Sequence, residues 1–270
     1  MLGNIRMMLA IMMVEFVAAS AGAAFELMPH RAIYGVTLAS AKSGSGIATV
    51  KGELLADWSE SCAGWILDHR SRLDVTYAPG QAVRLSSTVA TWESRDGLDY
   101  RFNVRNSANG RVTERIEGRA TLSAPGRTGR VVYERPAGRT DALPAGTVFP
   151  TTHSVRALEA AAKAPTMLSM PVFDGLTLDG TFSISAFLGR SMPPAKGLPH
   201  ALAALEGRLS WPLQMAFFPM TGHAAEPQHE IGMVMYDNGV GEDLKLDFGD
   251  FTVHARLLRL EMSERPSCGA

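Results

Sequence analysis

Cysteine is scarce in this chain, which has only Cys62 and Cys268 among its 270 residues. Two cysteines so far apart exclude a Cys-x-x-Cys redox site and a four-cysteine zinc site. Beyond the first residues, no stretch approaches the roughly 18 apolar residues that make a membrane-spanning helix. The mature chain is therefore expected to be soluble and not to span a membrane.

Charge of one sign is also lacking, because 26 basic residues face 27 acidic ones. This balance gives no support for nucleic-acid binding. The motifs G-x-S-x-G, H-E-x-x-H, G-x-G-x-x-G and the P-loop are all missing. These absences move the expectation from an enzyme toward a binding or scaffolding protein.

The remaining polar residues give little indication of a metal site or a catalytic site. His223 and His229 fit no standard zinc spacing, so we expect no metal and no cofactor. Asp68 and His69 are neighbours on a predicted strand, where their side chains point to opposite faces and cannot act together directly. We interpret this pair as polar residues on the outside of a sheet.

The N-terminus has the layout of a secretory signal peptide. A positive start at Arg6 precedes an apolar run at 7–14 and small residues that offer Ala-x-Ala cleavage sites at 19–21 and 21–23. Glu15 interrupts the pattern, and a buried amphipathic helix is the alternative. We predict that residues 1–23 are removed and that residues 24–270 form one domain.

Whether the two cysteines are free thiols or a disulfide depends on export of the chain to an oxidising compartment. Lone cysteine pairs in such compartments usually form a disulfide. A Cys62–Cys268 bond would close a loop of about 205 residues and hold the C-terminal tail. Two free thiols or an intermolecular bridge are the alternatives.

Alternating apolar residues and tight-turn dipeptides predict strands. "LDYRFNV" places Leu98, Tyr100, Phe102 and Val104 on one face. Asp-Gly and Asn-Gly dipeptides flank it at 96–97 and 109–110, which favours hairpin turns. The pattern recurs through the chain, and in "DFTVHARLLRLEM" the apolar phase slips at 257–258, which indicates a bulge.

About a dozen such segments predict an all-β fold, mainly antiparallel, of the sandwich or barrel type. The alanine-rich stretch at 152–164 lies between two prolines and is predicted to be the single short helix, with Val155 and Leu158 as its apolar contacts. The Pro- and Gly-rich connection at 189–207 is predicted to lie on the surface. If the sheet curls without closing, its inner face either lines a cavity or fills a solid core; the candidate residues are Tyr100, Phe102, Phe182, Ile184 and Phe248.

Several stretches resemble the EipB family, the periplasmic cell-envelope integrity proteins of alphaproteobacteria. They include "MPHRAIYGVTL", "CAGWILDHRSRLDV", "TWESRDGLDYRFNVRN", "GTVFPTTHSVRALEAA", "MYDNGVGEDLKLDFGDFTVHARLLRLE" and the closing "RPSC". The resemblance covers nearly all of the mature chain, and the order of the pieces together with the two cysteine positions makes it specific. The segment "SMPPAKGLPHALAALEGR" has no match in the family pattern.

This resemblance implies a β-spiral, a large sheet curled like a broken barrel around a cavity. It implies a Cys62–Cys268 disulfide and a periplasmic location. It also implies a role in envelope integrity under stress, with a tetratricopeptide-repeat protein as partner. The family has no established catalytic residues to carry over.

Three functions are compatible with these observations. The first, which we favour, is envelope maintenance through protein contacts without turnover. The second is a carrier or sensor of a lipid, lipoprotein or cell-wall fragment held in the cavity. The third is a hydrolase with an unrecognised site, which would show a polar cluster with perturbed pKa values. A redox switch at the cysteines is the least favoured, because a structural disulfide resists reduction.

Overall fold

The structure is a computed structural model that describes residues 25–220 and 225–268. The predicted signal peptide and His223 lie outside the described residues. The strands are β1 His30–Ala41, β2 Ile47–Ser61, β3 Gly64–Tyr77, β4 Ala82–Ser94, β5 Asp99–Ala108, β6 Arg111–Leu122, β7 Gly129–Arg135, β8 Thr140–Leu143, β9 Thr166–Val172, β10 Phe182–Leu188, β11 Ser210–Pro219, β12 His229–Tyr236, β13 Gly241–Asp247 and β14 Phe251–Met262. One α-helix, α1 (Pro150–Lys163), and one 3-10 helix, η1 (His200–Leu205), complete the described elements.

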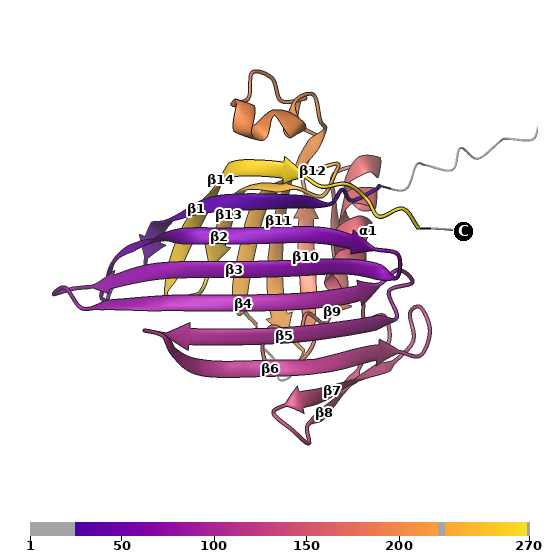
Figure 1. Cartoon of the computed structure of the whole chain (residues 1–270), viewed down its shortest axis with the longest axis horizontal. Helices are drawn as coiled ribbons and strands as arrows, with labels where there is room; N and C mark the ends of the chain where they lie inside the picture. The colour runs from indigo at the N-terminus through magenta and orange to yellow at the C-terminus, as the bar shows by residue number, and fades with distance from the viewer. Residues whose placement is uncertain (1–24, 221–224, 269–270) are drawn as a thin grey trace, which may run out of the picture.

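All fourteen strands belong to one sheet, in the order β8-β7-β6-β5-β4-β3-β2-β1-β14-β13-β12-β11-β10-β9. Every neighbouring pair of strands in it is antiparallel. The first and last strands pair in its middle, and β8 and β9 are its two edges. Strands β1 to β6 cross the front of the molecule while β10 to β13 run behind them (Figure 1). The predicted all-β fold and its unclosed, spiral form are therefore confirmed.

Local sequence signals account for the hairpins and the bulge. Between β5 and β6 both Asn109 and Gly110 have positive φ, at 50° and 79°, as a two-residue hairpin turn requires. In β14, Leu257 lies opposite Tyr34 and Arg259 opposite Ile33, so Leu258 is the extra residue of a bulge. The bulge falls where the apolar phase of the sequence slips, as predicted.

Helix α1 forms where the alanine-rich segment predicts it. Its buried side includes Ala157, Leu158 and Ala161, while Val155 is partly buried. A distant carboxylate caps its first turn: Glu93 on β4 accepts hydrogen bonds from the backbone N–H groups of Thr151 at 2.7 Å and Thr152 at 2.9 Å. Because the first backbone donors of a helix have no partner within the helix, this contact fixes α1 against the front strands.

Helix α1 fills one end of the spiral. Its buried face packs in a cluster that contains Trp58 and Trp65 of the front strands β2 and β3 and Trp211 of β11 behind them. The connection between β10 and β11 is only partly the surface excursion that we predicted. Its Leu202 and Leu205 are buried in the core that β14 shares with β1 and β2, because a short helical turn presents both leucines to the same side.

Among the described residues, no helix has the length and apolar character that crossing a membrane demands.

Candidate functional site: an inner cavity and a clamp at the chain ends

The inner face of the sheet encloses a cavity of about 220 Å³. Strands β1 to β5 form one wall, and β13, β14 and the loop after β9 form the other. Two partly exposed side chains, Leu176 and Phe248, lie at its edge. The lining residues are Val36, Leu54, His69, Ser71, Leu73, Ser87, Val89, Val104, Asn106, Leu176, Leu246, Phe248 and Val253. Most of this lining is apolar, with a narrow polar strip.

The polar strip follows from the strand register. Ser71 lies opposite Ser87, and Ser87 lies opposite Asn106, so their side chains share the inner face. Asn106 donates a hydrogen bond to Glu114 at 2.8 Å. His69 is two residues from Ser71 on the same face of β3, and therefore also points inward.

His69 corrects one sequence expectation. We expected Asp68 and His69 on the outside of the sheet, but the curl of the sheet turns His69 into the cavity and leaves Asp68 on the opposite face. The buried Nε2 atom of His69 has no hydrogen-bond partner among the described residues. Burial lowers the pKa of His69, so the ring is neutral at neutral pH.

The five side chains expected on the inner face have three different surroundings. Tyr100 and Phe102 are fully buried in an aromatic cluster, where Tyr100 stacks on Phe149 with ring centroids 4.9 Å apart. Phe182 and Ile184 are buried in a second cluster, near the β9 edge. Phe248 lines the cavity and is 51% exposed.

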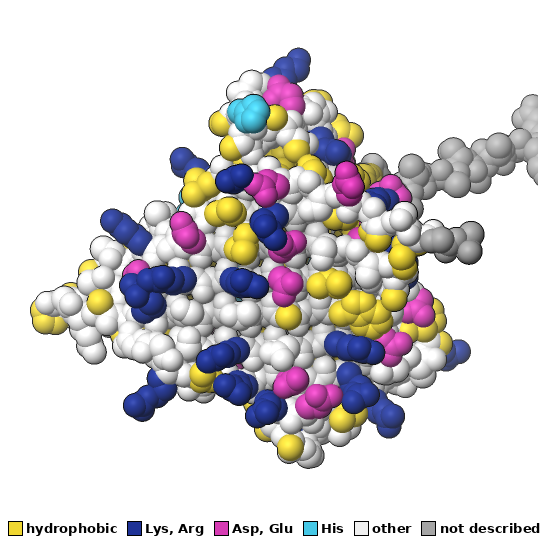
Figure 2. All heavy atoms as spheres, in the orientation of Figure 1, with side chains coloured by type: hydrophobic (Ala, Val, Ile, Leu, Met, Phe, Trp, Pro, Cys, Tyr) yellow, Lys and Arg dark blue, Asp and Glu magenta, His cyan; other side chains and the backbone are white. Residues whose placement is uncertain are grey.

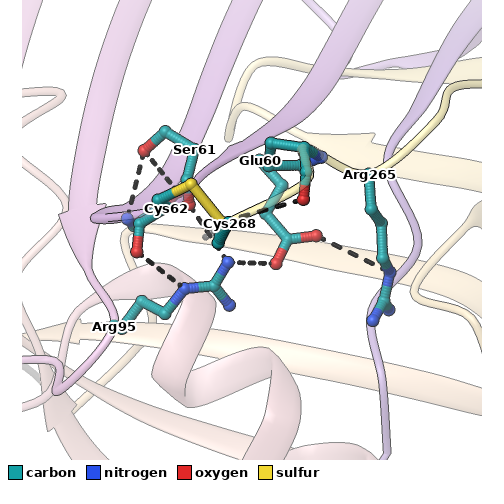
Figure 3. The surroundings of a disulfide bond; sticks show 8 residues. Glu60, Ser61, Cys62, Arg95, Arg265 and Cys268 are labelled. Atoms are coloured by element: carbon teal, nitrogen blue, oxygen red, sulfur yellow. Dashed lines mark hydrogen bonds and ion pairs between the residues drawn. A yellow bond between two sulfur atoms is a disulfide. The ribbon is translucent and has the colours of Figure 1, made fainter. Parts of the chain in front are cut away.

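The second feature is a clamp at the chain ends, made by Glu60, Cys62, Arg95, Arg265 and Cys268. Cys62, in the turn between β2 and β3, is joined to Cys268 by a disulfide bond (Figure 3). Beside it, Arg95 donates hydrogen bonds to the carbonyl oxygens of Cys62 at 3.2 Å and Ser61 at 3.0 Å. The tail of the chain is thus attached to a turn some 200 residues earlier in the sequence.

Glu60 is the centre of the clamp. Its side chain is only 5% exposed and lies between two guanidinium groups. Arg95 forms an ion pair with one of its carboxylate oxygens, and Arg265 Nε lies 3.6 Å from the other. Two cations offset the cost of burying one carboxylate.

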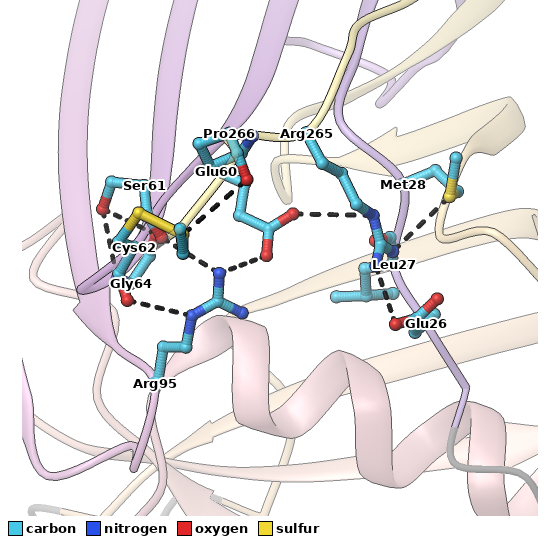
Figure 4. A network of polar contacts seen from close by, with 11 residues as sticks. Glu26, Leu27, Met28, Glu60, Ser61, Cys62, Gly64, Arg95, Arg265 and Pro266 are labelled. Carbon is cyan, nitrogen blue, oxygen red and sulfur yellow. Dashed lines mark hydrogen bonds and ion pairs between the residues drawn. A yellow bond between two sulfur atoms is a disulfide. The ribbon is translucent and has the colours of Figure 1, made fainter. Parts of the chain in front are cut away.

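Arg265 extends the clamp to the start of the described chain. It donates a hydrogen bond to the carbonyl of Leu27 at 2.9 Å and forms an ion pair with Glu26 at 2.7 Å (Figure 4). Both ends of the described chain are therefore held to the same turn. The sequence analysis missed Glu60 and Arg265, although each lies within three residues of a cysteine, and that proximity was the available signal.

In the described part of the chain, no three His, Cys, Asp or Glu side chains gather in a way that could hold a metal ion. His229 instead stacks on Phe217, with ring centroids 4.1 Å apart. The carboxylates and imidazoles that were considered as sequence candidates are thus spread over separate parts of the fold.

The protein is thus an open antiparallel β-spiral with an inner cavity, in which both ends of the described chain are clamped to one turn. The sequence profile of the EipB-like family matches residues 21–264, and the chain belongs to that family. The cell envelope integrity protein EipB of Brucella abortus (strain 2308) is 29% identical over 254 residues, which cover 91% of this chain and 88% of that protein.

A solved structure has the same architecture. The crystal structure of a beta-barrel-like protein of domain of unknown function DUF1849 from Brucella abortus superposes with a TM-score of 0.82 at 26% identity. The match covers 89% of this chain and 100% of that chain. The similarity therefore extends over most of this chain.

Proposed function

We propose that this chain helps to keep the cell envelope intact under stress, that it works in the periplasm, and that it binds other envelope molecules without catalysis. The name of the relative from Brucella abortus supports the envelope role. The signal-peptide pattern and the cysteine pair support the periplasm. The relatives found carry names that indicate no enzyme family.

The observation that carries binding by protein contact is an apolar pair at the β9 edge. Met167 on β9 lies directly opposite Phe187 on β10, and the two residues are 59% and 53% exposed. Among the described residues no further strand pairs with β9, and a single parallel bridge, between Val148 and Val172, lies at the end of β9 away from Met167. Large apolar side chains that project from an open edge are typical of a site where a partner docks.

A shallow groove of about 440 Å³ adjoins this pair on the outer face of β10, β11 and β12. Phe187 and Pro212 are among its apolar lining residues, while Gly189 and Gly232 keep it open. An amphipathic helix fits such a groove by inserting apolar side chains on one face. A tetratricopeptide-repeat protein, which is built of amphipathic helices, is the partner that we propose.

A double variant tests this proposal. Met167→Gln with Phe187→Gln removes the apolar pair but leaves the core unchanged, because both residues are exposed. Truncating a central aromatic contact of an interface costs about 2 kcal/mol or more, which is about 30-fold in affinity. We expect tagged wild-type protein, but not the variant, to recover its partner from periplasm, and the variant to fail to restore detergent resistance in cells that lack the protein.

Leu258→Gln is the matched control, because Leu258 is 52% exposed but lies on β14, away from the β9 edge. It should recover the partner as the wild type does. Equal recovery by the double variant, or full restoration of detergent resistance, would contradict this site.

The inner cavity supports a second candidate function, a carrier or sensor of an amphiphile. Its wall is mostly apolar, and the unpaired Nε2 atom of His69 could meet one polar group. At about 220 Å³ it is smaller than the typical pocket for a drug-sized ligand, roughly 300–1,000 Å³. It would therefore accept one acyl chain or a small cell-wall fragment.

Native mass spectrometry of protein purified from periplasm tests the carrier. We expect additional mass that is lost on denaturation, and we expect Val104→Trp, which fills the cavity, to abolish it. If the wild-type protein carries no additional mass, the carrier function is contradicted and binding by protein contacts is the function that remains.

The cavity also bears on hydrolysis. A serine nucleophile needs a hydrogen bond to its general base. Ser71 and Ser87 are near His69 in the cavity lining, but among the described residues Nε2 of that ring has no hydrogen-bond partner. This geometry supports binding over turnover.

A further inference from the structure

The segment that forms β3 to β7 and its turns has an unusual choice of basic residue. Residues 64–139 contain thirteen arginines and no lysine, against eight acidic residues. Arginine presents a rigid fork of donors that matches phosphate and carboxylate groups, whereas lysine is a point charge. An excess of five positive charges, all of them arginine, therefore points to an anionic partner.

The strand register places several of these arginines in rows on the outer face. Arg70 on β3 lies opposite Thr88 on β4, which lies opposite Arg105 on β5, which lies opposite Arg115 on β6. Thus three of the four residues in this row are arginines. A second pair of facing arginines, Arg101 and Arg119, lies nearer the other end of β5 and β6.

Facing arginines are a cost to the fold, since like charges directly opposite each other on neighbouring strands are destabilising. Acidic side chains on the outer face do not neutralise the charges of Arg70, Arg105 and Arg115. Among the described residues, none of these three guanidinium groups has a carboxylate oxygen within 4.0 Å. The ion pairs on this face go to other arginines, in the pairs Arg84–Asp74, Arg119–Glu134 and Arg135–Glu117.

The shape of the face leaves these arginines accessible. Thr88 of β4 lies between Arg70 of β3 and Arg105 of β5, and the next outward side chains of β4 on either side of it, Ser86 and Ala90, are also small. Two hollows of about 660 and 220 Å³ open on the outer side of β4 to β6, and Arg105 and Arg115 line the smaller one. Figure 2 shows basic side chains spread over the face that β3 to β6 form in Figure 1.

The apolar part of this face is small: Ile66 and Trp92, both partly buried, line the larger hollow, and the guanidinium group of Arg101 lies over the Trp92 ring at 5.1 Å. Among the described residues, the exposed large hydrophobic side chains all lie outside residues 64–139. Protein interfaces usually have an apolar core enriched in aromatic residues and methionine. Arginines spread in two dimensions over a face with so small an apolar part suit a surface of many fixed negative charges.

We propose that the outer face of β3 to β6 binds the phosphate headgroups of an anionic lipid bilayer as a peripheral electrostatic contact. Guanidinium groups of Arg70, Arg105 and Arg115 each pair with lipid phosphates, and the small side chains of β4 let the headgroups approach. This contact is separate from the β9 edge, so one molecule can lie on a membrane and hold a protein partner.

Co-sedimentation with vesicles tests the proposal on the full mature chain. We expect binding to vesicles that contain phosphatidylglycerol and none to pure phosphatidylcholine vesicles. Binding should weaken as salt rises from about 0.1 M to about 1 M, where the screening length falls from ~10 Å to ~3 Å. Each basic residue near an anionic membrane is worth about fivefold in partitioning, so Arg105→Gln with Arg115→Gln should lower the partition coefficient about 25-fold.

Arg156→Gln with Arg190→Gln is the matched control, because it removes the same charge from α1 and from the loop after β10, where both residues are exposed. Its partition coefficient should stay at the wild-type value. The Arg105/Arg115 variant should also melt no lower than the wild type, since it relieves a facing pair of like charges.

Two results would overturn the proposal. One is a wild-type protein that does not sediment with anionic vesicles at low salt. The other is an equal loss of binding in both double variants, which would show a response to net charge alone. If soluble polyglutamate binds the wild type while the vesicles do not, the face recognises an acidic polypeptide and the membrane assignment is wrong.

Discussion

Replacing both cysteines tests how much stability the clamp supplies. The bond joins residues that are 206 positions apart, and the chain-entropy relation gives about 5 kcal/mol for a loop of that length. Without the bond, however, Pro266 to Cys268 regain freedom in the native state at about 1 kcal/mol per residue. Arg265 still holds the tail before that point. The net loss expected for Cys62→Ser with Cys268→Ser is therefore about 2–3 kcal/mol.

For a chain of this length, that loss corresponds to a melting temperature about 5–10 °C lower. The assay is thermal unfolding followed by circular dichroism, with and without reductant. Reduced wild-type protein should have the same melting temperature as the double variant, and reductant should not change the melting temperature of the variant. Equal melting temperatures for oxidised wild type and the variant would contradict this expected loss, as would a variant that does not fold.

Two further predictions concern the loop that covers the aromatic cluster. In Gly175→Ala the new Cβ would lie 2.5 Å from the ring of Phe102, at a φ of +68°, and we expect the free energy of unfolding to fall by about 3 kcal/mol. Gly180 has a similar φ but no atom within 4 Å of the new Cβ, so Gly180→Ala should lower the free energy of unfolding by only about 1 kcal/mol. Equal melting temperatures for the two variants would contradict the steric argument. Burial raises the pKa of Asp174 to about 6, so the contribution of this carboxyl group to stability is present below about pH 4 and lost as the pH rises through about 6. Asp174→Asn removes the titration, and its stability relative to wild type should rise by up to about 3 kcal/mol between about pH 4 and pH 7 in denaturant titrations; a difference that does not vary with pH would disprove the assignment.

The local sequence predicted the elements because their signals need only neighbouring residues. Alternation in "LDYRFNV" and the Asn-Gly turn after it define β5 and its hairpin with β6, and both are present. The phase slip at Leu258 locates the bulge in β14 for the same reason. An alanine-rich segment between prolines likewise predicts α1 without reference to the rest of the chain.

The site residues show where that reasoning ends. Alternation places Tyr100 on the inner face and separates Asp68 from His69, but it does not say which of these two points inward or what lies opposite the inward residues. Phe149 and Phe173, which arrive from distant connections, make the surroundings of Tyr100 a packed cluster. Strands β13 and β14 leave open space opposite His69.

The amino-acid sequence was enough to predict an all-β chain of antiparallel hairpins with one helix, because strand, turn and helix signals are short-range. It did not determine that β1 pairs with β14, that Glu60 and Arg265 link the two ends of the described chain, or that arginines of β3, β5 and β6 share one row; these are properties of the folded sheet. Those arrangements depend on the register and curl of strands far apart in the chain, and long-range pairing sets both.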